Sequence, residues 1–179
     1  ASTELTLAGS PRITTARPIC KHFARPAFMQ AFKCQPTRTD MKHKRFDMDM
    51  FDQTDSPARE ATKEYISRKG YTAIDNPDKY CADLIVEGLC FIECECKLAW
   101  KGPKFPWPSV HLPQRKKKFA KLSMPVQFYI WNKEYSHAMR ICGWQLTDDK
   151  LIEVPNKMIA NGEYFYDIPT NETHIISKD

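Results

Sequence analysis

Three charged residues occupy alternate positions in one short apolar run, CADLIVEGLCFIECECKLAW, which spans residues 81–100. Because side chains alternate between the two faces of a β-strand, Glu93, Glu95 and Lys97 are expected on one face, opposite Cys94 and Cys96. Cysteine is among the residues most often buried, so the face with the cysteines is the predicted core face. The two carboxylates on the other face repel each other unless a cation lies beside them. The pattern therefore indicates a cation site.

Asp83 begins the preceding strand, which a tight turn around Glu87-Gly88 is expected to fold back as a β-hairpin. A three-residue loop over 87–89 places Asp83 opposite Glu93, and a longer or bulged loop shifts it towards Glu95. A two-residue turn would instead place Asp83 on the other face of the sheet. The register of the hairpin therefore decides whether a third carboxylate joins the site.

Carboxylates with no histidine nearby suit a hard cation that prefers oxygen ligands. We therefore expect Mg²⁺ or Mn²⁺ as the cofactor, bound by Asp83, Glu95 and Glu93. Lys97 can orient an attacking water molecule, or stabilise the negative charge that develops on a phosphate. Together these groups indicate metal-assisted hydrolysis of a phosphodiester.

Asp83 followed by Glu95-x-Lys97 resembles the signature of the PD-(D/E)xK nuclease superfamily, in which an Asp opens one strand and Glu-x-Lys lies on the next. Ala82 stands where the signature has Pro, and Glu93-x-Glu95 allows a second assignment, similar to the form found in some restriction endonucleases. The resemblance implies a Mg²⁺-dependent endodeoxyribonuclease in which Asp83, Glu95 and Lys97 are catalytic. It also implies an α/β (α+β) fold, with a restriction-endonuclease-like core of a mixed sheet flanked by helices.

Many members of this superfamily carry a Glu on the helix before the signature strands. AREATKEYISRKGY, residues 58–71, looks like that helix, with Glu60 as the catalytic candidate and Glu64 as its alternative. The spacing from Glu60 to Gly70 is similar to that in phage junction-resolving endonucleases. The helix itself is predicted to begin at residues 55–57, Asp-Ser-Pro, and to end at Gly70.

A block without acidic residues follows the signature, from Cys96 to Lys133, in a chain with a net charge of +5. Such a block suits a polyanion, because each neutralised phosphate releases counterions. A solvated helix face is the alternative. Members of the superfamily often have a helix here with a Gln or Lys near the active site, which favours Gln114 and Arg115. We predict DNA, duplex or branched, as the partner, contacted by Lys101, Lys104, Gln114, Arg115, Lys116, Lys117, Lys118 and Lys121.

Trp100, Phe105 and Trp107 lie in a proline-broken loop within this block. Their rings can stack on unpaired bases, or they can hold the loop against its own domain. The second interpretation is favoured.

The chain is interpreted as an N-terminal arm or peripheral element over residues 1–54 and a nuclease-like domain over 55–179. Further strands are predicted at 125–132 and 137–144, a helix at 111–122 and a hairpin turn at Asn161-Gly162. The order helix, strand, strand, helix, strand, strand predicts an α+β domain.

No apolar run reaches the roughly 20 residues of a membrane helix, and the opening residues do not resemble a secretory signal. Seven cysteines without a disulfide-type spacing predict reduced thiols. We therefore expect an intracellular protein, in the cytoplasm, nucleus or an organelle, or encoded by a phage. The resemblance implies a homodimer. Two other hypotheses are a non-catalytic nucleic-acid-binding protein and a module with zinc on Cys90, Cys94 and Cys96, although packed core thiols are the simpler interpretation.

Overall fold

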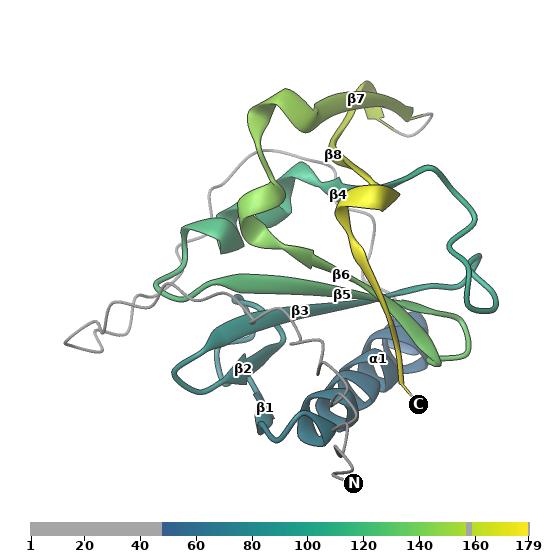
Figure 1. Cartoon of the computed structure of the whole chain (residues 1–179). Coiled ribbons are helices and arrows are strands. Elements are labelled where there is room, and N and C mark those ends of the chain that lie inside the picture. The colour runs from purple at the N-terminus through teal and green to yellow at the C-terminus, as the bar shows by residue number, and fades with distance from the viewer. Residues whose placement is uncertain (1–47, 157–158, 179) are drawn as a thin grey trace, which may run out of the picture. The chain divides into compact units, whose positions relative to one another are not determined.

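The computed structural model describes residues 48–156 and 159–178 of the 179-residue chain. One α-helix, α1 (Met48–Arg68), precedes two β-sheets in this part of the chain (Figure 1). The larger sheet has six strands in the order β1 (Ala73–Asp75), β2 (Leu84–Val86), β3 (Cys90–Lys97), β5 (Val126–Asn132), β6 (His137–Cys142) and β9 (His174–Ser177). The smaller sheet has the order β4 (Ser109–Pro113), β8 (Ile159–Pro169) and β7 (Leu151–Asn156).

Short 3-10 helices lie in the connections between the strands. They are η1 (Gln114–Lys121), η2 (Gly143–Gln145), η3 (Asp148–Lys150) and η4 (Thr170–Glu172).

The larger sheet is mixed because β3 and β5 run parallel, whereas its other neighbouring strands are antiparallel. Parallel neighbours need a long connection that crosses one face of the sheet. Here that connection contains β4 and η1. The structure therefore confirms a mixed α+β domain. We refer to the lysine- and arginine-rich residues 101–121 of this connection as the basic segment, and Lys116 within it contacts Glu95 of β3.

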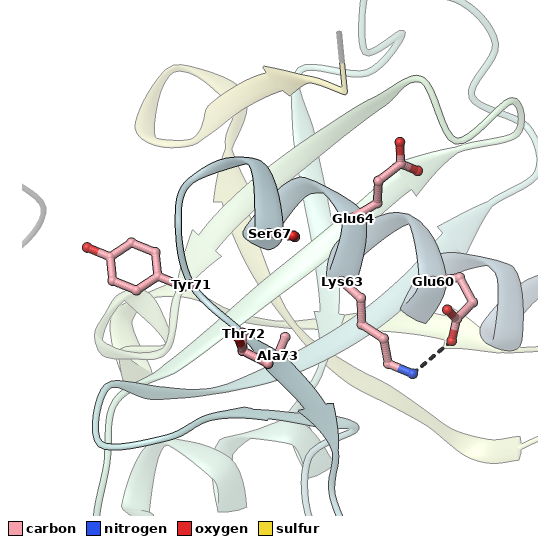
Figure 2. Close-up of a pocket in the computed structure, with 7 residues that line it drawn as sticks. All are labelled: Glu60, Lys63, Glu64, Ser67, Tyr71, Thr72 and Ala73. Carbon is pink, nitrogen blue, oxygen red and sulfur yellow. Dashed lines mark hydrogen bonds and ion pairs between the residues drawn. The ribbon is translucent and has the colours of Figure 1, made fainter.

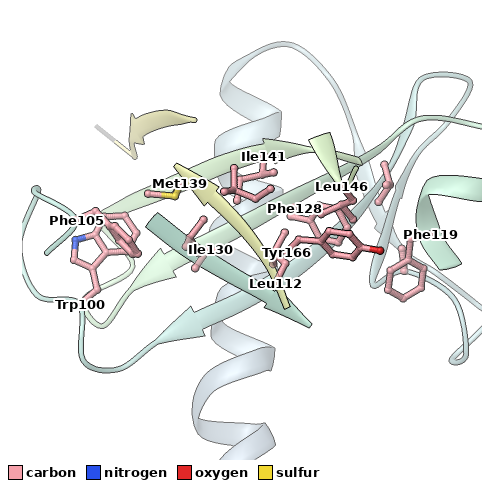
Figure 3. Packing of buried hydrophobic residues seen from close by; sticks show 14 residues of the cluster. Trp100, Phe105, Leu112, Phe119, Phe128, Ile130, Met139, Ile141, Leu146 and Tyr166 are labelled. Atoms are coloured by element: carbon pink, nitrogen blue, oxygen red, sulfur yellow. The ribbon is translucent and has the colours of Figure 1, made fainter. Parts of the chain in front are cut away.

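Two hydrophobic clusters pack on opposite faces of the larger sheet. The first joins the apolar side of α1 to alternate residues of β3 and β5, such as Cys94, Tyr129 and Trp131. The second fills the space between the two sheets and includes Phe128, Ile130 and Tyr166 (Figure 3). In Figure 1, α1 lies on one side of β3, β5 and β6, and β4, β8 and β7 lie on the other. The larger sheet is thus the middle layer.

The buried stripe of α1 follows the helical period. Ala58, Ala61, Thr62 and Ile66 are buried against the sheet, which matches residues three and four apart on one face of a helix. α1 begins at Met48, so the predicted start at residues 55–57 is wrong. Pro57 lies inside the helix, where it has no N–H to donate.

Other predictions about elements have mixed outcomes. The strands expected at 125–132 and 137–144 are confirmed as β5 and β6. The helix expected at 111–122 is a 3-10 helix that begins at Gln114, because the residues before it belong to β4. A β7–β8 hairpin is present, but Gly162 lies within β8 opposite a register shift in β7. Most of the arm predicted for residues 1–54 lies outside the described residues.

The aromatic loop is held against its own domain, as favoured above. Trp100 and Phe105 are buried in the second cluster, with ring centroids 5.1 Å apart in an edge-to-face arrangement. Trp107 packs edge-on against Phe105 but remains 41% exposed. Among the helices of residues 48–156 and 159–178, none has the length and apolar character needed to cross a bilayer.

Candidate active site

The β2–β3 hairpin has a three-residue loop over 87–89, which is one of the three alternatives considered above. Val86 pairs with Cys90 and Leu84 pairs with Ile92, so Asp83 is the next residue along and lies across from Glu93. The alternative in which Asp83 lies opposite Ile92 is excluded by this register. The period-2 pattern of buried residues fixed the pairing, because Leu84, Val86, Cys90 and Ile92 all enter the cluster beneath α1.

Asp83 immediately precedes Leu84, the first residue of β2, and its side chain forms a hydrogen bond with the backbone of β3. The backbone N–H of Cys94 donates to Asp83 Oδ2 at 2.8 Å. Arg59 of α1 donates to Asp83 Oδ1 through Nη2 at 2.6 Å. Asp83 therefore connects the helix to the edge of β3, beside the strand face that carries the two glutamates.

Glu93 and Glu95 lie on the face of β3 that is turned away from α1. Their parallel partners Phe128 and Ile130 belong to the cluster between the two sheets, whereas Cys94 belongs to the cluster beneath α1. The side chains of Glu93 and Glu95 are 15% and 27% exposed. Two adjacent carboxylates in such a sheltered position need cations nearby.

Two lysines supply those cations. Lys97, on the same strand face, donates to Glu95 Oε1 at 2.9 Å. Lys116 of η1 reaches both glutamates, with its Nζ 3.0 Å from Glu95 Oε2 and 3.3 Å from Glu93 Oε1. We refer to the six residues that share these contacts as the charged cluster: Arg59, Asp83, Glu93, Glu95, Lys97 and Lys116.

The position of Lys116 follows from the geometry of η1. A 3-10 helix has three residues per turn, so residues i and i+3 lie on the same side. Lys116 and Phe119 are the two buried residues of η1, and Phe119 packs in the cluster between the sheets. The ring of Phe119 therefore anchors the helix with Lys116 directed at the glutamates.

The charged cluster shifts the pKa values of its two glutamates in opposite directions. Burial raises the pKa of Glu93 to about 7, even though Lys116 opposes the shift. Burial also acts to raise the pKa of Glu95, but the positive charges of Lys116 and Lys97 outweigh it and hold that pKa at about 2. The pKa of Lys116 rises to about 12, because the charges of Glu95 and Glu93 overcome the effect of burial. At neutral pH Glu95 is thus the firmly ionised member of the pair.

The donor set of the charged cluster consists of carboxylate oxygens, which is the chemistry that Mg²⁺ and Mn²⁺ prefer. Within the described ranges, however, no three His, Cys, Asp or Glu side chains are arranged to hold a metal ion directly. Glu93 and Glu95 converge on the Lys116 ammonium instead, and Asp83 is bonded to Arg59. The position between the glutamates is thus occupied by the Lys116 ammonium.

Glu60 and Glu64 lie apart from these contacts. Glu60 is 69% exposed and accepts a hydrogen bond from Lys63, which also donates to Asp75 of β1. Glu64 bonds to Arg68 and Lys178. Glu60, Lys63 and Glu64 of α1 line a pocket of about 420 Å³ together with the start of β1 (Figure 2).

Among the acidic residues of α1 whose side chains the structure describes, Asp55 approaches the charged cluster, and the sequence analysis placed it at the predicted start of the helix. Burial raises the pKa of Asp55, and Asp83, Lys116 and Glu95 all act on its charge. Asp55 and Arg59 are one helical turn apart and so share a side of α1. The four-residue spacing of Asp55 and Arg59 could have predicted that both side chains lie on the same side of the helix. It was missed because the helix was predicted to begin at residues 55–57.

The remaining residues of the basic segment are distributed unevenly. Lys117 bonds to Asp148 and lies near the ring of Tyr166. Lys118 is exposed and donates to the backbone oxygen of Tyr80 at 3.0 Å. The other predicted contact residues are exposed: Lys101, Lys104, Gln114, Arg115 and Lys121. Lys116 is thus the one residue of this predicted set that η1 turns into the charged cluster.

The three cysteines considered for zinc are on the face beneath α1. Cys90 and Cys94 are buried in the first hydrophobic cluster, and Cys96 packs against it. The thiol of Cys94 donates to the Thr62 hydroxyl at 3.3 Å, and that of Cys96 to the backbone oxygen of Asn132 at 3.7 Å. These contacts fit packed core thiols.

Comparison of the chain with protein-family models, with curated proteins and with solved structures found no match. The inference of function therefore depends on the geometry of the charged cluster and on the chemistry of its side chains.

Proposed function

We propose that this chain is a metal-dependent endonuclease that hydrolyses phosphodiester bonds in DNA, with a PD-(D/E)xK-type site in a restriction-endonuclease-like core. The observation that carries the proposal is the bonded pair Glu95–Lys97 on one strand face, with Asp83 across the hairpin from Glu93. This is the order and strand placement that the signature requires. The helix, hairpin, basic segment and apolar strand follow in the same order along the chain.

Glu95, Asp83 and Glu93 are the proposed metal ligands, and Glu95 contributes a full negative charge because its pKa is about 2. A bound Mg²⁺ or Mn²⁺ would activate water and neutralise charge on the phosphate. Lys97 is 29% exposed and is held by Glu95, so its ammonium can donate to a water molecule or to a phosphate oxygen that approaches the site. Glu60 remains a predicted catalytic residue without a contact in the charged cluster, and Asp55 is better placed on α1.

The partner is proposed to be DNA, contacted through its phosphates by the exposed residues of the basic segment. Arg115 and Lys121 flank Lys116 on η1 and are exposed, so they can reach the backbone of a strand whose phosphate lies at Lys97. A homodimer remains a prediction from the resemblance, and an intracellular location remains a prediction from the sequence.

The test is incubation of the protein with supercoiled plasmid, single-stranded DNA and a synthetic four-way junction, in Mn²⁺, in Mg²⁺ and in EDTA. We expect cleavage of at least one substrate with a divalent ion and none in EDTA. Asp83→Asn, Glu95→Gln and Lys97→Ala should each lower the cleavage rate by at least about 100-fold, because each removes a group that acts at the phosphate.

Asp75→Asn is the matched control, since Asp75 is also an aspartate of the larger sheet but bonds to Lys63 outside the charged cluster. This variant should cleave at the rate of the unsubstituted protein. Equal loss in Asp75→Asn and Asp83→Asn would point to a general effect on folding and would remove the support for a specific site.

A second function is favoured by one observation: the carboxylates of the charged cluster are already bonded to Arg59, Lys97 and Lys116. Such a neutralised cluster fits a non-catalytic nucleic-acid-binding protein descended from a nuclease. The same assay separates the two functions. Retarded migration of DNA without cleavage in any divalent ion, by the unsubstituted protein, would favour the binding protein.

A further inference from the structure

We infer that Lys116 is an internal counter-cation, which occupies the position of the divalent ion between Glu93 and Glu95 and must leave when that ion binds. This inference rests on the proposed function, because it concerns the metal site of the same charged cluster. It adds a role that the sequence analysis did not assign, since Lys116 was expected to contact DNA phosphates.

The first argument is the location of the Lys116 ammonium. Its Nζ lies 3.3 Å from Glu93 Oε1 and 3.0 Å from Glu95 Oε2, and the Lys116 side chain is 11% exposed. Lysine is almost never buried without a partner. Here it is buried between two carboxylates of one strand face, which is the place where a shared cation reduces their repulsion most.

The second argument is that the lysines next to Lys116 on η1 do not contact Glu93 or Glu95. Lys117 bonds to Asp148 and Lys118 to the backbone oxygen of Tyr80, so the run of lysines is divided among three separate partners. Because Phe119 is fixed in the core, the backbone of η1 holds the root of Lys116 in place. Only the flexible side chain needs to move, and lysine has four rotatable bonds for doing so.

The third argument is charge. The cluster contains three carboxylates and three cationic side chains, so a divalent ion added without loss of a lysine would bring two positive charges beside Lys116 and Lys97. Like charges at such distances repel strongly in a sheltered site. The ammonium of Lys116 and a divalent ion are therefore alternative occupants. A displaced Lys116 would stay tethered to η1, and its charge would favour an incoming phosphate.

The experiment compares Lys116→Met with Lys118→Met, a matched substitution of an exposed lysine on the same helix. Thermal unfolding is measured in EDTA and in Mn²⁺, and Mn²⁺ affinity is measured by isothermal titration calorimetry. We expect Lys116→Met to lower the melting temperature in EDTA by roughly 5–10 °C, because it leaves two sheltered carboxylates with one lysine. Mn²⁺ should restore most of this loss, since it binds the folded state.

We also expect Lys116→Met to bind Mn²⁺ on the order of tenfold more tightly than the unsubstituted protein, because the competing cation is gone. Lys118→Met should match the unsubstituted protein in both measurements. Unchanged Mn²⁺ affinity in Lys116→Met, or a loss of stability that Mn²⁺ does not restore, would overturn the inference and leave Lys116 as a static ion-pair partner.

A second pair of variants keeps the test valid if Lys116→Met does not fold in EDTA. Glu93→Gln and Glu93→Gln/Lys116→Met differ only at Lys116, and the double variant removes one charge of each sign. Removal of Lys116 should again raise Mn²⁺ affinity in this background, and equal affinities of the two variants would contradict the inference.

The two proposals fail in different ways. Cleavage of DNA by the unsubstituted protein, combined with unchanged Mn²⁺ affinity in Lys116→Met, removes the counter-cation role and leaves the nuclease. If Mn²⁺ binds neither the unsubstituted protein nor Lys116→Met and no DNA is cleaved, both proposals are wrong.

Discussion

Glu93 and Glu95 are two residues apart on one strand face, yet their surroundings separate them chemically. Glu95 bonds to two lysines, and its pKa is held at about 2. Glu93 has a longer contact with Lys116, and burial raises its pKa to about 7. A pair of carboxylates with such different acidities is typical of functional sites, although ion-pair networks produce it too. At the level of single residues, the first measurable consequence is a dependence of stability on pH.

The raised pKa of Glu93 should make the folded protein less stable as the pH rises from about 4.5 to about 7. In this range the folded state holds a proton on Glu93 that the unfolded state has released, so the free energy of unfolding falls with increasing pH. The loss should be roughly 3–4 kcal/mol, at about 1.4 kcal/mol for each pKa unit. Glu93→Gln cannot titrate and should lack this loss. Urea unfolding of both proteins at pH 5, 6, 7 and 8 measures the difference.

Glu87→Gln is the control for this prediction, since Glu87 is exposed in the loop of the same hairpin. It should follow the pH dependence of the unsubstituted protein. If the stability of Glu93→Gln relative to the unsubstituted protein is the same at pH 5 and pH 8, Glu93 does not titrate in this range.

At the scale of elements, the site depends on how α1 is fixed to the sheet. Thr62 is fully buried, and its hydroxyl accepts a hydrogen bond from Trp131 Nε1 at 2.8 Å while donating to the backbone oxygen of Ala58, also at 2.8 Å. The Cys94 thiol donates to the same hydroxyl. The Thr62 side chain thus links α1 to both β3 and β5, which are the two parallel neighbours of the larger sheet.

Thr62→Val should lower the free energy of unfolding by about 1–3 kcal/mol, because the Trp131 N–H would be left buried without an acceptor. Thr62→Ser keeps the hydroxyl and loses one methyl group, so it should cost only about 1 kcal/mol. Urea unfolding at neutral pH compares the two variants with the unsubstituted protein. Equal stability of Thr62→Val and Thr62→Ser would contradict a role for the hydroxyl.

The elements that the sequence predicted best are those with a strong local period. The alternation of Ile92, Glu93, Cys94 and Glu95 predicted both faces of β3. The hairpin register depended on the loop length, which the sequence left open and the structure shows to be three residues. The smaller sheet was not predicted, because β4 pairs with β8 across more than forty intervening residues and only the tertiary contacts reveal it. The start of α1 was predicted wrongly because proline favours the first turn of a helix, whereas Pro57 lies further inside α1.

The site was predicted incompletely for related reasons. Glu95 and Lys97 are bonded on one strand face, and Asp83 lies across the hairpin from Glu93. From α1, Arg59 contacts Asp83, whereas Glu60 contacts Lys63. A run of consecutive lysines carries no signal of which one is buried. The three-residue period of η1 selects Lys116, and that period becomes visible only when the helix is known to be of the 3-10 type.

On the scale of the whole molecule, fewer basic side chains are exposed in the fold than the sequence of the basic segment suggested. The chain has a net charge of +5, and its acid-free block suggested eight contacts with DNA. In the folded protein Lys116 is bonded to Glu95 within the charged cluster, and Lys117 is bonded to Asp148. The cationic residues of this set that stay exposed are Lys101, Lys104, Arg115, Lys118 and Lys121.

This smaller set makes a quantitative prediction about DNA binding. If about four of these residues contact phosphates, the affinity for a short duplex should fall by about a hundredfold between 50 and 200 mM salt, because each contact releases a counterion. Arg115→Ala and Lys121→Ala should each reduce the slope of log K against log salt concentration by about one. Fluorescence anisotropy with labelled DNA in EDTA measures binding without cleavage. Lys69→Ala, at the exposed end of α1, should keep the full slope, and a slope that none of these substitutions changes would place the DNA on another surface.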